Sequence, residues 1–354
     1  MKKIKEFNEL ILKTKNKRTA IIHDTDPDGL CSAVISCIAL QRITGRKPLL
    51  LHQNPGEIAL TEHSIELLKE NFIEFVVTVD LSVDQKPEPI KEIEGFAEIL
   101  VLDHHKTYNE INSEKTLMVK SQDLTGKEGS SYPVSKLAFD LFSGLTDLRD
   151  LDWIACIGLL GDNAYFEWKD FVDSGMKKYN QGTEIRKSTL FKVTQLIEAI
   201  ETMDYSKLKD LIQVMLAAKK PEDVLKKDFL IELEELEKEV VFWEKKFEKE
   251  KKVFPEKQLV YFEIFPKHSV KSVLINRVSD KMKNMTVIIV QDFNEEHVYL
   301  SARRQDLKVK VNDLLEKSIK GIPDSFAGGH APAAGGRIPK KYLNKFKKQL
   351  VESA

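Results

Sequence analysis

The sequence predicts an α/β protein, with a mostly parallel sheet flanked by helices in a first domain, then a helical connector and a smaller α/β domain. Short apolar runs alternate with helical segments over residues 1–170. Residues 171–256 show almost only helical periodicity, and strand-like runs return over residues 257–354. Strands that alternate with helices are typical of a parallel sheet covered on both faces. We therefore expect three regions with these boundaries.

The composition is that of an ordinary globular chain. It has 354 residues and a formal net charge of −1, so no overall basic character favours nucleic acid. Residues 301–350 hold 12 Lys and Arg against 4 Asp and Glu. This local excess indicates either a polyanionic partner or a solvated helical surface.

Cysteine usage and the N-terminus indicate the compartment. The chain has 3 cysteines, at positions 31, 37 and 156, and an odd number without metal-knuckle spacing argues against a disulfide framework. The N-terminus lacks the apolar run of a signal peptide, and no stretch approaches the ~18 apolar residues of a membrane span. We expect a cytoplasmic protein that does not enter membranes.

Three strands and three helices are predicted in the first region. The apolar runs at residues 19–22, 75–80 and 97–103 predict strands. Helical periodicity covers residues 30–45 and ends at Gly45, because glycine favours helix termination. Residues 131–142 and 151–162 predict two further helices.

The helical region has one long amphipathic segment, residues 228–252. Its apolar residues recur at alternating steps of four and three, which places them on one helix face. A long helix packed on its own protein and an intermolecular coiled coil both fit this stripe. The stripe consists of Phe229, Leu233, Leu236, Val240, Trp243 and Phe247.

The last region predicts a second α/β domain. Strands are expected at residues 259–265, 285–293 and 297–303, with a helix over 270–282 between the first two. The turn "NEE" (294–296) joins the second and third strands as a hairpin. A helix over 310–318 leads to "FAGGHAPAAGGRIP" (326–339), which we expect to be a glycine-rich loop.

Acidic residues and histidines follow the apolar segments of the first region. Because the carboxyl ends of parallel strands meet at one edge, these side chains should gather there. Singly, each is weak evidence: "HDTDPDG" is typical of a turn, and a lone Asp after a strand is typical of a helix cap. Four segments supply the set: Asp24, Asp26 and Asp28; Asp80; Asp103, His104 and His105; and Asp162.

So many carboxylates in one place favour a metal centre. Bare anions crowded together are costly, and divalent cations reverse that cost. Oxygen ligands with one or two imidazoles suit Mn²⁺ or Mg²⁺ better than a structural zinc ion. Two such ions activate a water for attack on phosphorus. The sequence therefore predicts a two-metal centre, with Mn²⁺ as the cofactor and Mg²⁺ as the alternative.

The motifs resemble those of the DHH phosphoesterase superfamily. "DTDPDG" (24–29), "VD" (79–80), "DHH" (103–105) and "GD" (161–162) are similar to its motifs one to four. "SAR" (301–303) and "AGGHAPAAGG" (327–336) resemble its substrate-binding half, the DHHA1 domain. The overall layout is most similar to archaeal RecJ-like exonucleases. The resemblance implies a DHH domain, the connector and a DHHA1 domain.

The resemblance implies a role for each site residue of the first domain. One metal site would use Asp24, Asp26 and Asp80, and the other Asp28, Asp80, His104 and Asp162, with Asp80 bridging the ions. Asp103 would hold an imidazole in place, and His105 would face the scissile phosphate. One branch of the family has a metal-binding histidine where this chain has Ile22, so His23 is expected to be structural.

In the second domain, the resemblance implies a site for the terminal nucleotide. Arg303, two residues after Ser301 in the S-x-R pattern, would grip a phosphate. Arg304 either assists or faces solvent, and Arg337 is a further phosphate-binding candidate. The backbone of a glycine-rich loop would approach the nucleotide at Gly328, Gly329 and His330. Ala327 stands where the family often has the first glycine.

The function that the resemblance implies is hydrolysis of phosphodiester bonds. We expect a single-strand exonuclease, acting 3′ to 5′ on DNA or RNA in replication, repair or RNA turnover. One alternative is an oligoribonuclease or cyclic-dinucleotide phosphodiesterase, and another is a non-catalytic replication scaffold. A helicase or another replication protein is the expected protein partner. Digestion polarity, the preference for DNA or RNA and the oligomeric state are left open by the sequence.

Overall fold

The computed structural model describes residues 2–53, 60–292 and 295–354. The chain divides into two compact units. The first unit comprises Met1–Glu201 and Ser206–Phe229, and the second comprises Thr202–Tyr205 and Leu230–Ala354. Each unit contains its own sheet, so each can be described by itself.

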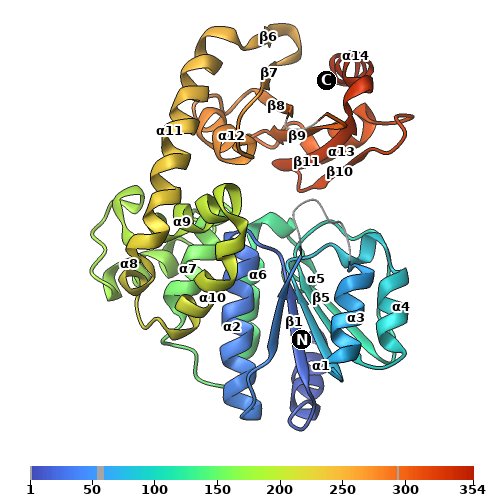
Figure 1. The fold of residues 1–354 in the computed structure, drawn as a ribbon, viewed down its shortest axis with the longest axis vertical. Helices are drawn as coiled ribbons and strands as arrows, with labels where there is room; N and C mark the ends of the chain where they lie inside the picture. The colour runs from blue at the N-terminus through green and yellow to red at the C-terminus, as the bar shows by residue number, and fades with distance from the viewer. Residues whose placement is uncertain (1, 54–59, 293–294) are drawn as a thin grey trace. The chain divides into compact units, whose positions relative to one another are not determined.

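The first unit is built around a five-stranded parallel sheet with the order β2-β1-β3-β4-β5 (Figure 1). The predicted strands at β1, β3 and β4 are confirmed, whereas β2 and β5 were not predicted. Both unpredicted strands lie at the edges of the sheet. The strands are β1 (Thr19–His23), β2 (Leu49–His52), β3 (Phe75–Val79), β4 (Glu98–Asp103) and β5 (Thr116–Lys120).

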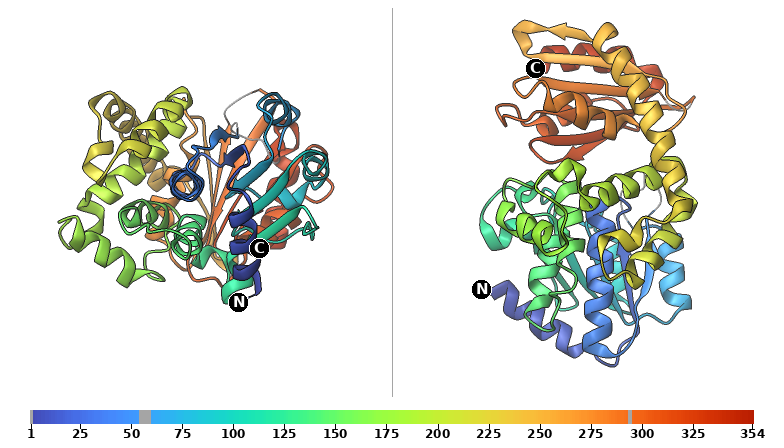
Figure 2. Two further views of the ribbon diagram at one scale, coloured as in Figure 1. Left: turned by 90° about the horizontal axis from the view of Figure 1, so that it is seen from below. Right: turned by 90° about the vertical axis from the view of Figure 1, so that its left-hand side faces the viewer.

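Helices cover both faces of this sheet. Ile22 and Val76 pack in one core with Ile65 of α3 and Ile93 of α4. The alternate strand residues face α2 and α6, on which α7 packs in turn. The end-on view in Figure 2 shows α2 opposite α3 and α4. The helices are α1 (Lys2–Lys13), α2 (Pro27–Thr44), α3 (Glu62–Glu70), α4 (Glu88–Glu94), α5 (Ser121–Thr125), α6 (Val134–Ser143) and α7 (Asp152–Gly161).

The connector is helical, as predicted. Its helices are α8 (Lys169–Lys178), α9 (Thr189–Met203), α10 (Leu208–Ala217) and α11 (Lys227–Glu250). The C-terminal part of the apolar stripe of α11 packs inside the second unit, since the Trp243 and Phe247 rings lie 6.4 and 5.4 Å from the Phe262 ring. Packing of the long helix on its own protein is therefore confirmed. No helix in the described part of the chain is long and apolar enough to cross a bilayer.

The second unit holds a six-stranded mixed sheet with the order β10-β11-β9-β8-β7-β6. Among the residues described in this unit, β7 and β8 pair in parallel and the other neighbouring strands pair antiparallel. Helices α13 and α14 share a core with one face of the sheet. The elements are β6 (Lys252–Phe254), β7 (Leu259–Ile264), α12 (Lys271–Asp280), β8 (Thr286–Asp292), β9 (His297–Arg303), α13 (Val311–Ser318), β10 (Phe326–Gly329), β11 (Ala333–Pro339) and α14 (Leu343–Ser353).

Two details of the second unit can be compared with the sequence. The predicted glycine-rich loop is instead an antiparallel hairpin of β10 and β11, because small residues allow close pairing with β9. The predicted turn "NEE" includes residue 294, which lies outside the described residues. The α/β class with a helical connector is confirmed throughout.

Candidate metal centre

Three parallel strands bring acidic residues to one edge of the first sheet. Asp24 follows β1, Asp80 follows β3, and Asp103 is the last residue of β4. The Asp24 N–H donates to the Val79 carbonyl at 3.4 Å, and the Asp80 N–H donates to the Leu102 carbonyl at 3.0 Å. The sheet therefore gathers carboxylates that are far apart in the sequence.

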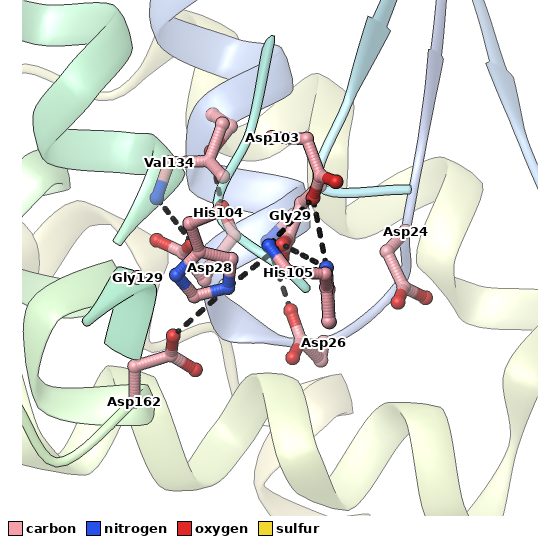
Figure 3. A network of polar contacts seen from close by, with 12 residues as sticks. Asp24, Asp26, Asp28, Gly29, Asp103, His104, His105, Gly129, Val134 and Asp162 are labelled. Carbon is pink, nitrogen blue, oxygen red and sulfur yellow. Dashed lines mark hydrogen bonds and ion pairs between the residues drawn. The ribbon is translucent and has the colours of Figure 1, made fainter. Parts of the chain in front are cut away.

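A tight group of donor atoms forms beside these strand ends. The ligand atoms of Asp28, His104 and Asp162 all lie within 4.8 Å of one another. The His104 Nε2 lies 3.2 Å from Asp80 Oδ1 and 3.4 Å from Asp162 Oδ2. Figure 3 shows the His104 ring beside Asp28 and directed toward Asp162. The structure thus brings together all four residues predicted for the second metal site.

The other two predicted ligands, Asp24 and Asp26, make local contacts. Asp26 caps α2, since its Oδ1 accepts the Gly29 N–H at 2.8 Å. Asp24 Oδ1 accepts the Thr25 N–H at 2.7 Å, and in Figure 3 Asp24 lies on the other side of His105 from Asp162. Among the described residues, neither belongs to a group of three whose ligand atoms all lie within 4.8 Å of one another.

Asp28 is fixed by the start of α6. Its Oδ2 accepts the Val134 N–H at 2.6 Å, and its Oδ1 accepts the Ser135 N–H at 3.0 Å and hydroxyl at 2.5 Å. A helix N-terminus is a natural place for a negative charge. On the facing helix α7, a Cβ at Gly158 would lie 2.2 Å from Ser135 Oγ and 2.9 Å from Asp28 Oδ1. A residue larger than glycine at position 158 would therefore clash with Ser135 and the Asp28 carboxylate.

Asp80 has a strained backbone. Its φ is 60°, in the left-handed region that few residues other than glycine adopt. The side chain is 2 % exposed. Non-glycine residues held in this region cluster at functional sites, where the surroundings enforce the conformation.

The carboxyls are buried and close to one another, and this disfavours their charged forms. Burial and the charges of Asp28 and Asp26 raise the pKa of Asp80 well above its usual value. Burial and the charge of Asp24 raise the pKa of Asp26 in the same way. Burial raises the pKa of Asp28 to about 6, although hydrogen bonds from α6 oppose the shift. Without a cation, each of these carboxyls therefore makes ionisation of the others less favourable.

The surroundings of His104 and His105 shift the pKa values of the two rings in opposite directions. Burial, and then the nearby charge of His105, lower the pKa of His104 to about 3, so its ring is neutral. Burial also opposes the charged form of His105, but the Asp103 carboxylate outweighs it and raises the pKa of His105. The His105 Nδ1–H donates to Asp103 Oδ1 at 2.8 Å. Asp103 is therefore the residue that orients His105.

These residues fit a divalent metal ion. Several carboxylates and one neutral imidazole are the ligands that Mn²⁺ and Mg²⁺ accept. The raised pKa values of Asp26, Asp28 and Asp80 show that the group lacks positive charge. A divalent ion would supply that charge and favour the ionised carboxylates.

The sequence did not identify three residues that contribute to this region. Ser135 binds Asp28, Lys120 binds Asp103 at 2.9 Å, and Glu201 of α9 accepts a hydrogen bond from the Thr25 hydroxyl at 3.1 Å. The charge of Glu201 also helps to raise the pKa of Asp26. None stands in a recognisable motif, since each reaches the site only through tertiary packing.

His23 is buried beside the site. Its Nδ1–H donates to the Asp24 carbonyl at 2.6 Å, and its ring lies 6.3 Å from the His52 ring. Burial lowers the pKa of His23 to about 4, so the ring is neutral. It also lines a cavity of about 510 Å³ next to β2. These contacts agree with the structural role expected from the sequence.

In the second unit, the sheet register brings part of the predicted substrate site together. Arg303 of β9 pairs with Ala333 of β11, next to the turn that carries His330. The Arg303 Nε–H donates to Asn276 Oδ1 at 2.8 Å, which orients the guanidinium. Ser301 lies on the same strand two residues before Arg303.

The hairpin turn depends on one of the two predicted glycines. Gly329 has a φ of 129°, and a Cβ there would lie 2.6 Å from the Ala333 carbonyl oxygen. Gly328 has an ordinary φ and pairs with Gly335. The alanine at position 327 takes part in the strand pairing, so the missing glycine does not disturb the hairpin.

The two other predicted phosphate-binding arginines lie elsewhere. Arg337 pairs in register with Tyr299, four residues along β9 from Arg303, which is ~13 Å at the rise of a strand. Its guanidinium lies 3.5 Å from Asp324. Arg304 is neither placed to assist Arg303 in binding a phosphate nor exposed to solvent. It is fully buried and pairs with Asp306 at 2.6 Å.

Two family models match the chain. Residues 18–155 match the DHH family, N-terminal domain, and residues 257–354 match the DHHA1 domain. A search of curated protein sequences gave no match.

Solved structures share the fold at low identity. RecJ from Thermus thermophilus in complex with Mn²⁺ is 16% identical, with a TM-score of 0.74, over 100% of this chain and 55% of that chain. A manganese-bound exonuclease RecJ is 16% identical, with a TM-score of 0.70, over 99% and 94% of the two chains. CDC45 from Entamoeba histolytica is 12% identical, with a TM-score of 0.57, over 99% of each chain. The chain thus spans about half the length of the Thermus protein.

Proposed function

Because the chain belongs to the DHH/DHHA1 phosphoesterase family of metal-dependent hydrolases that act on phosphoester bonds, we propose that it is a manganese-dependent exonuclease. It removes nucleotides one at a time from the 3′ end of single-stranded DNA or RNA. The observation that supports this most strongly is the group formed by the buried Asp28, Asp80 and His104 with the half-buried Asp162.

These four residues would hold the metal ions. Asp80 lies closest to the middle of the site, since its Oδ1 is 3.2 Å from His104 Nε2 and 3.7 Å from His105 Nδ1. Asp24 and Asp26 would complete the other half. When bound, two divalent ions lower the pKa of a water and stabilise the charge that develops on phosphorus.

His105 would act on the substrate rather than on the metal. Asp103 fixes its ring through Nδ1 and favours the charged form. A charged imidazole beside the scissile phosphate neutralises part of the developing charge. This gives the two adjacent histidines separate roles, His104 as a ligand and His105 as a phosphate contact.

The second unit would bind the end of the strand. Arg303 offers a guanidinium fork that suits a phosphate, and Asn276 holds it in place. The neighbouring turn with Gly329 and His330 would accommodate the terminal nucleotide. RecJ from Thermus thermophilus supports this reading only through its fold, because the identity is 16%.

The test follows labelled single strands of about 20 nucleotides, long enough to reveal a path for a continuous strand. DNA and RNA are labelled at the 5′ or the 3′ end and incubated with Mn²⁺ or with EDTA. The proposal predicts that the 3′ label is released at once as a mononucleotide, while the 5′ label moves down a ladder. EDTA should abolish both.

Other outcomes would contradict the proposal. Cleavage of a dinucleotide without cleavage of the longer strands would indicate an oligonucleotide phosphodiesterase. Immediate release of the 5′ label would reverse the polarity. No Mn²⁺-dependent cleavage of any substrate would favour a non-catalytic scaffold.

A further inference from the structure

Lys120, the last residue of β5, is a fully buried cation next to the candidate metal centre. Its Nζ lies 2.9 Å from Asp103 Oδ2 and 3.2 Å from Asp84 Oδ1. The parallel register of β4 and β5 places Asp103 and Lys120 side by side. A buried charge is tolerated only when it is paired and hydrogen-bonded. The side chains of Lys120, Asp103 and Asp84 therefore form one ion-pair network.

The same ammonium group also holds the backbone after the histidine pair. It donates to the His105 carbonyl at 3.1 Å and to the Lys106 carbonyl at 3.0 Å. The Gln122 amide donates to the same His105 carbonyl at 2.7 Å. Side chains from β5 and α5 therefore fix the start of the segment that follows β4.

Asp84 fixes the other end of that segment. Its Oδ2 accepts the Tyr108 N–H at 2.6 Å and the Asn109 N–H at 3.3 Å. The Asn109 side chain donates back to the Asp84 carbonyl at 2.8 Å. Lys120 and Asp84 thus hold residues 105–109 from both ends while they pair with each other.

The Asp103 carboxylate links this ion-pair network to His105. One oxygen accepts the His105 Nδ1–H at 2.8 Å, and the other lies 2.9 Å from the Lys120 ammonium. The carboxylate cannot rotate without losing one of these contacts. The orientation of the His105 ring therefore depends on Lys120, which does not touch it.

We propose that Lys120 and Asp84 are positioning residues that hold His105 toward the substrate phosphate. This inference rests on the proposed function, since it gives His105 a phosphate to contact. A purely structural ion pair would also stabilise the fold, but it would leave the catalytic rate of the folded protein unchanged. The two roles can be separated by experiment.

The main test is Lys120→Met, which keeps the length of the side chain and removes its charge. We expect kcat for Mn²⁺-dependent hydrolysis to fall about 10- to 100-fold, as for residues that orient groups at a metal centre. KM and Mn²⁺ affinity should change by less than about threefold, because the ligands themselves are untouched. The NMR signal of the His105 Nδ1–H, assigned by its absence in His105→Gln, should disappear.

Two further variants keep the test interpretable. Asp84→Asn retains the shape and the Lys120–Asp103 pair, so it should fold even if Lys120→Met does not, and it should lower kcat by a smaller factor. Lys178→Met is the control, because it removes a lysine that pairs with Asp152 at 2.8 Å elsewhere in the first unit. It should leave kcat and the His105 signal unchanged.

The proposal is overturned if folded Lys120→Met or Asp84→Asn keeps the wild-type kcat, or if Lys120→Met keeps the His105 signal. A lower melting temperature with normal kcat would show a purely structural pair. If the wild-type protein hydrolyses none of the substrates, the proposed function fails. The NMR experiment then still decides whether Lys120 orients the His105 ring.

Discussion

At the scale of single residues, Asp80 combines an unfavourable backbone with an unfavourable charge. Its φ of 60° is one that Asp and Asn tolerate better than most side chains. Burial and neighbouring carboxylates raise its pKa well above the usual value. Asparagine would keep the backbone conformation and the shape while removing the charge, so it separates function from stability.

We predict that Asp80→Asn lowers Mn²⁺-dependent hydrolysis by at least about 100-fold, because the variant loses the proposed central metal ligand. In the metal-free protein at neutral pH, the same change should raise the free energy of unfolding by about 1–3 kcal/mol. Kinetics with Mn²⁺ and denaturant unfolding in EDTA measure the two effects.

Asp173→Asn is the matched control for this prediction. Asp173 lies in α8, is partly exposed and pairs with Lys169, which lowers its pKa. Losing this charge should leave activity unchanged and give no gain in stability. Wild-type activity in Asp80→Asn would disprove the central role of Asp80.

At the scale of elements, the packing of α7 against α6 controls Asp28. Gly158 leaves room for Ser135 and the carboxylate, since an added Cβ would lie 2.2 Å from Ser135 Oγ. We predict that Gly158→Ala lowers the free energy of unfolding by about 1–3 kcal/mol through overpacking, despite the better helix propensity of alanine. Mn²⁺ affinity, measured by calorimetry, should fall as well.

The control is Gly144→Ala at the end of α6. An added Cβ there meets only the Leu141 carbonyl oxygen, at 3.4 Å, and the φ of Gly144 is −71°. This variant should keep the wild-type Mn²⁺ affinity. Equal Mn²⁺ affinity in Gly158→Ala and Gly144→Ala would show that the position of the Asp28 carboxylate does not depend on the packing of α7 against α6.

The elements also show what the sequence could predict. The strands β1, β3 and β4 are central and mostly apolar, so their pattern is clear, and each is followed by or ends in a carboxylate. The edge strands β2 and β5 were not predicted, although β5 has five residues, as many as β1 and β3. The ligand types at four places along the chain were enough to predict the site at one edge of the sheet.

Contacts between residues that are distant in the sequence and lie outside any motif could not be predicted. Nothing near Lys120 in the sequence indicates that it pairs with Asp103, and nothing near Glu201 indicates that it approaches Asp26. Arg304 follows Arg303 directly, yet it points into the core and pairs with Asp306. Which neighbour of a motif is buried depends on packing that one sequence does not reveal.

At the scale of the whole molecule, metal binding should control stability. Saturating Mn²⁺, at about 100 times its dissociation constant, should stabilise the first unit by about 2.7 kcal/mol and raise its melting temperature by about 5–10 °C. The rise is expected because the ions relieve repulsion among the buried carboxylates. Differential scanning calorimetry with Mn²⁺ and with EDTA measures it.

The effect should depend on pH. In the metal-free fold the pKa of Asp28 is about 6, above its usual value. This group therefore favours the fold at low pH, and the contribution is lost as the pH rises through about 6. Protons also compete with Mn²⁺ below that value, so the Mn²⁺-induced rise should be smaller at about pH 5 than at about pH 7.5. A rise that is independent of pH would exclude Asp28 as a ligand.

The separation of the ligands along the chain has a kinetic consequence. Asp28, Asp80, His104 and Asp162 meet only when β3, β4 and α7 have all reached their places in the first unit. Contacts between residues so distant in sequence form late in folding, because long loops must close first. Mn²⁺ should therefore leave the folding rate almost unchanged and slow unfolding instead. A chain that has bound its metal would stay folded longer without having folded faster.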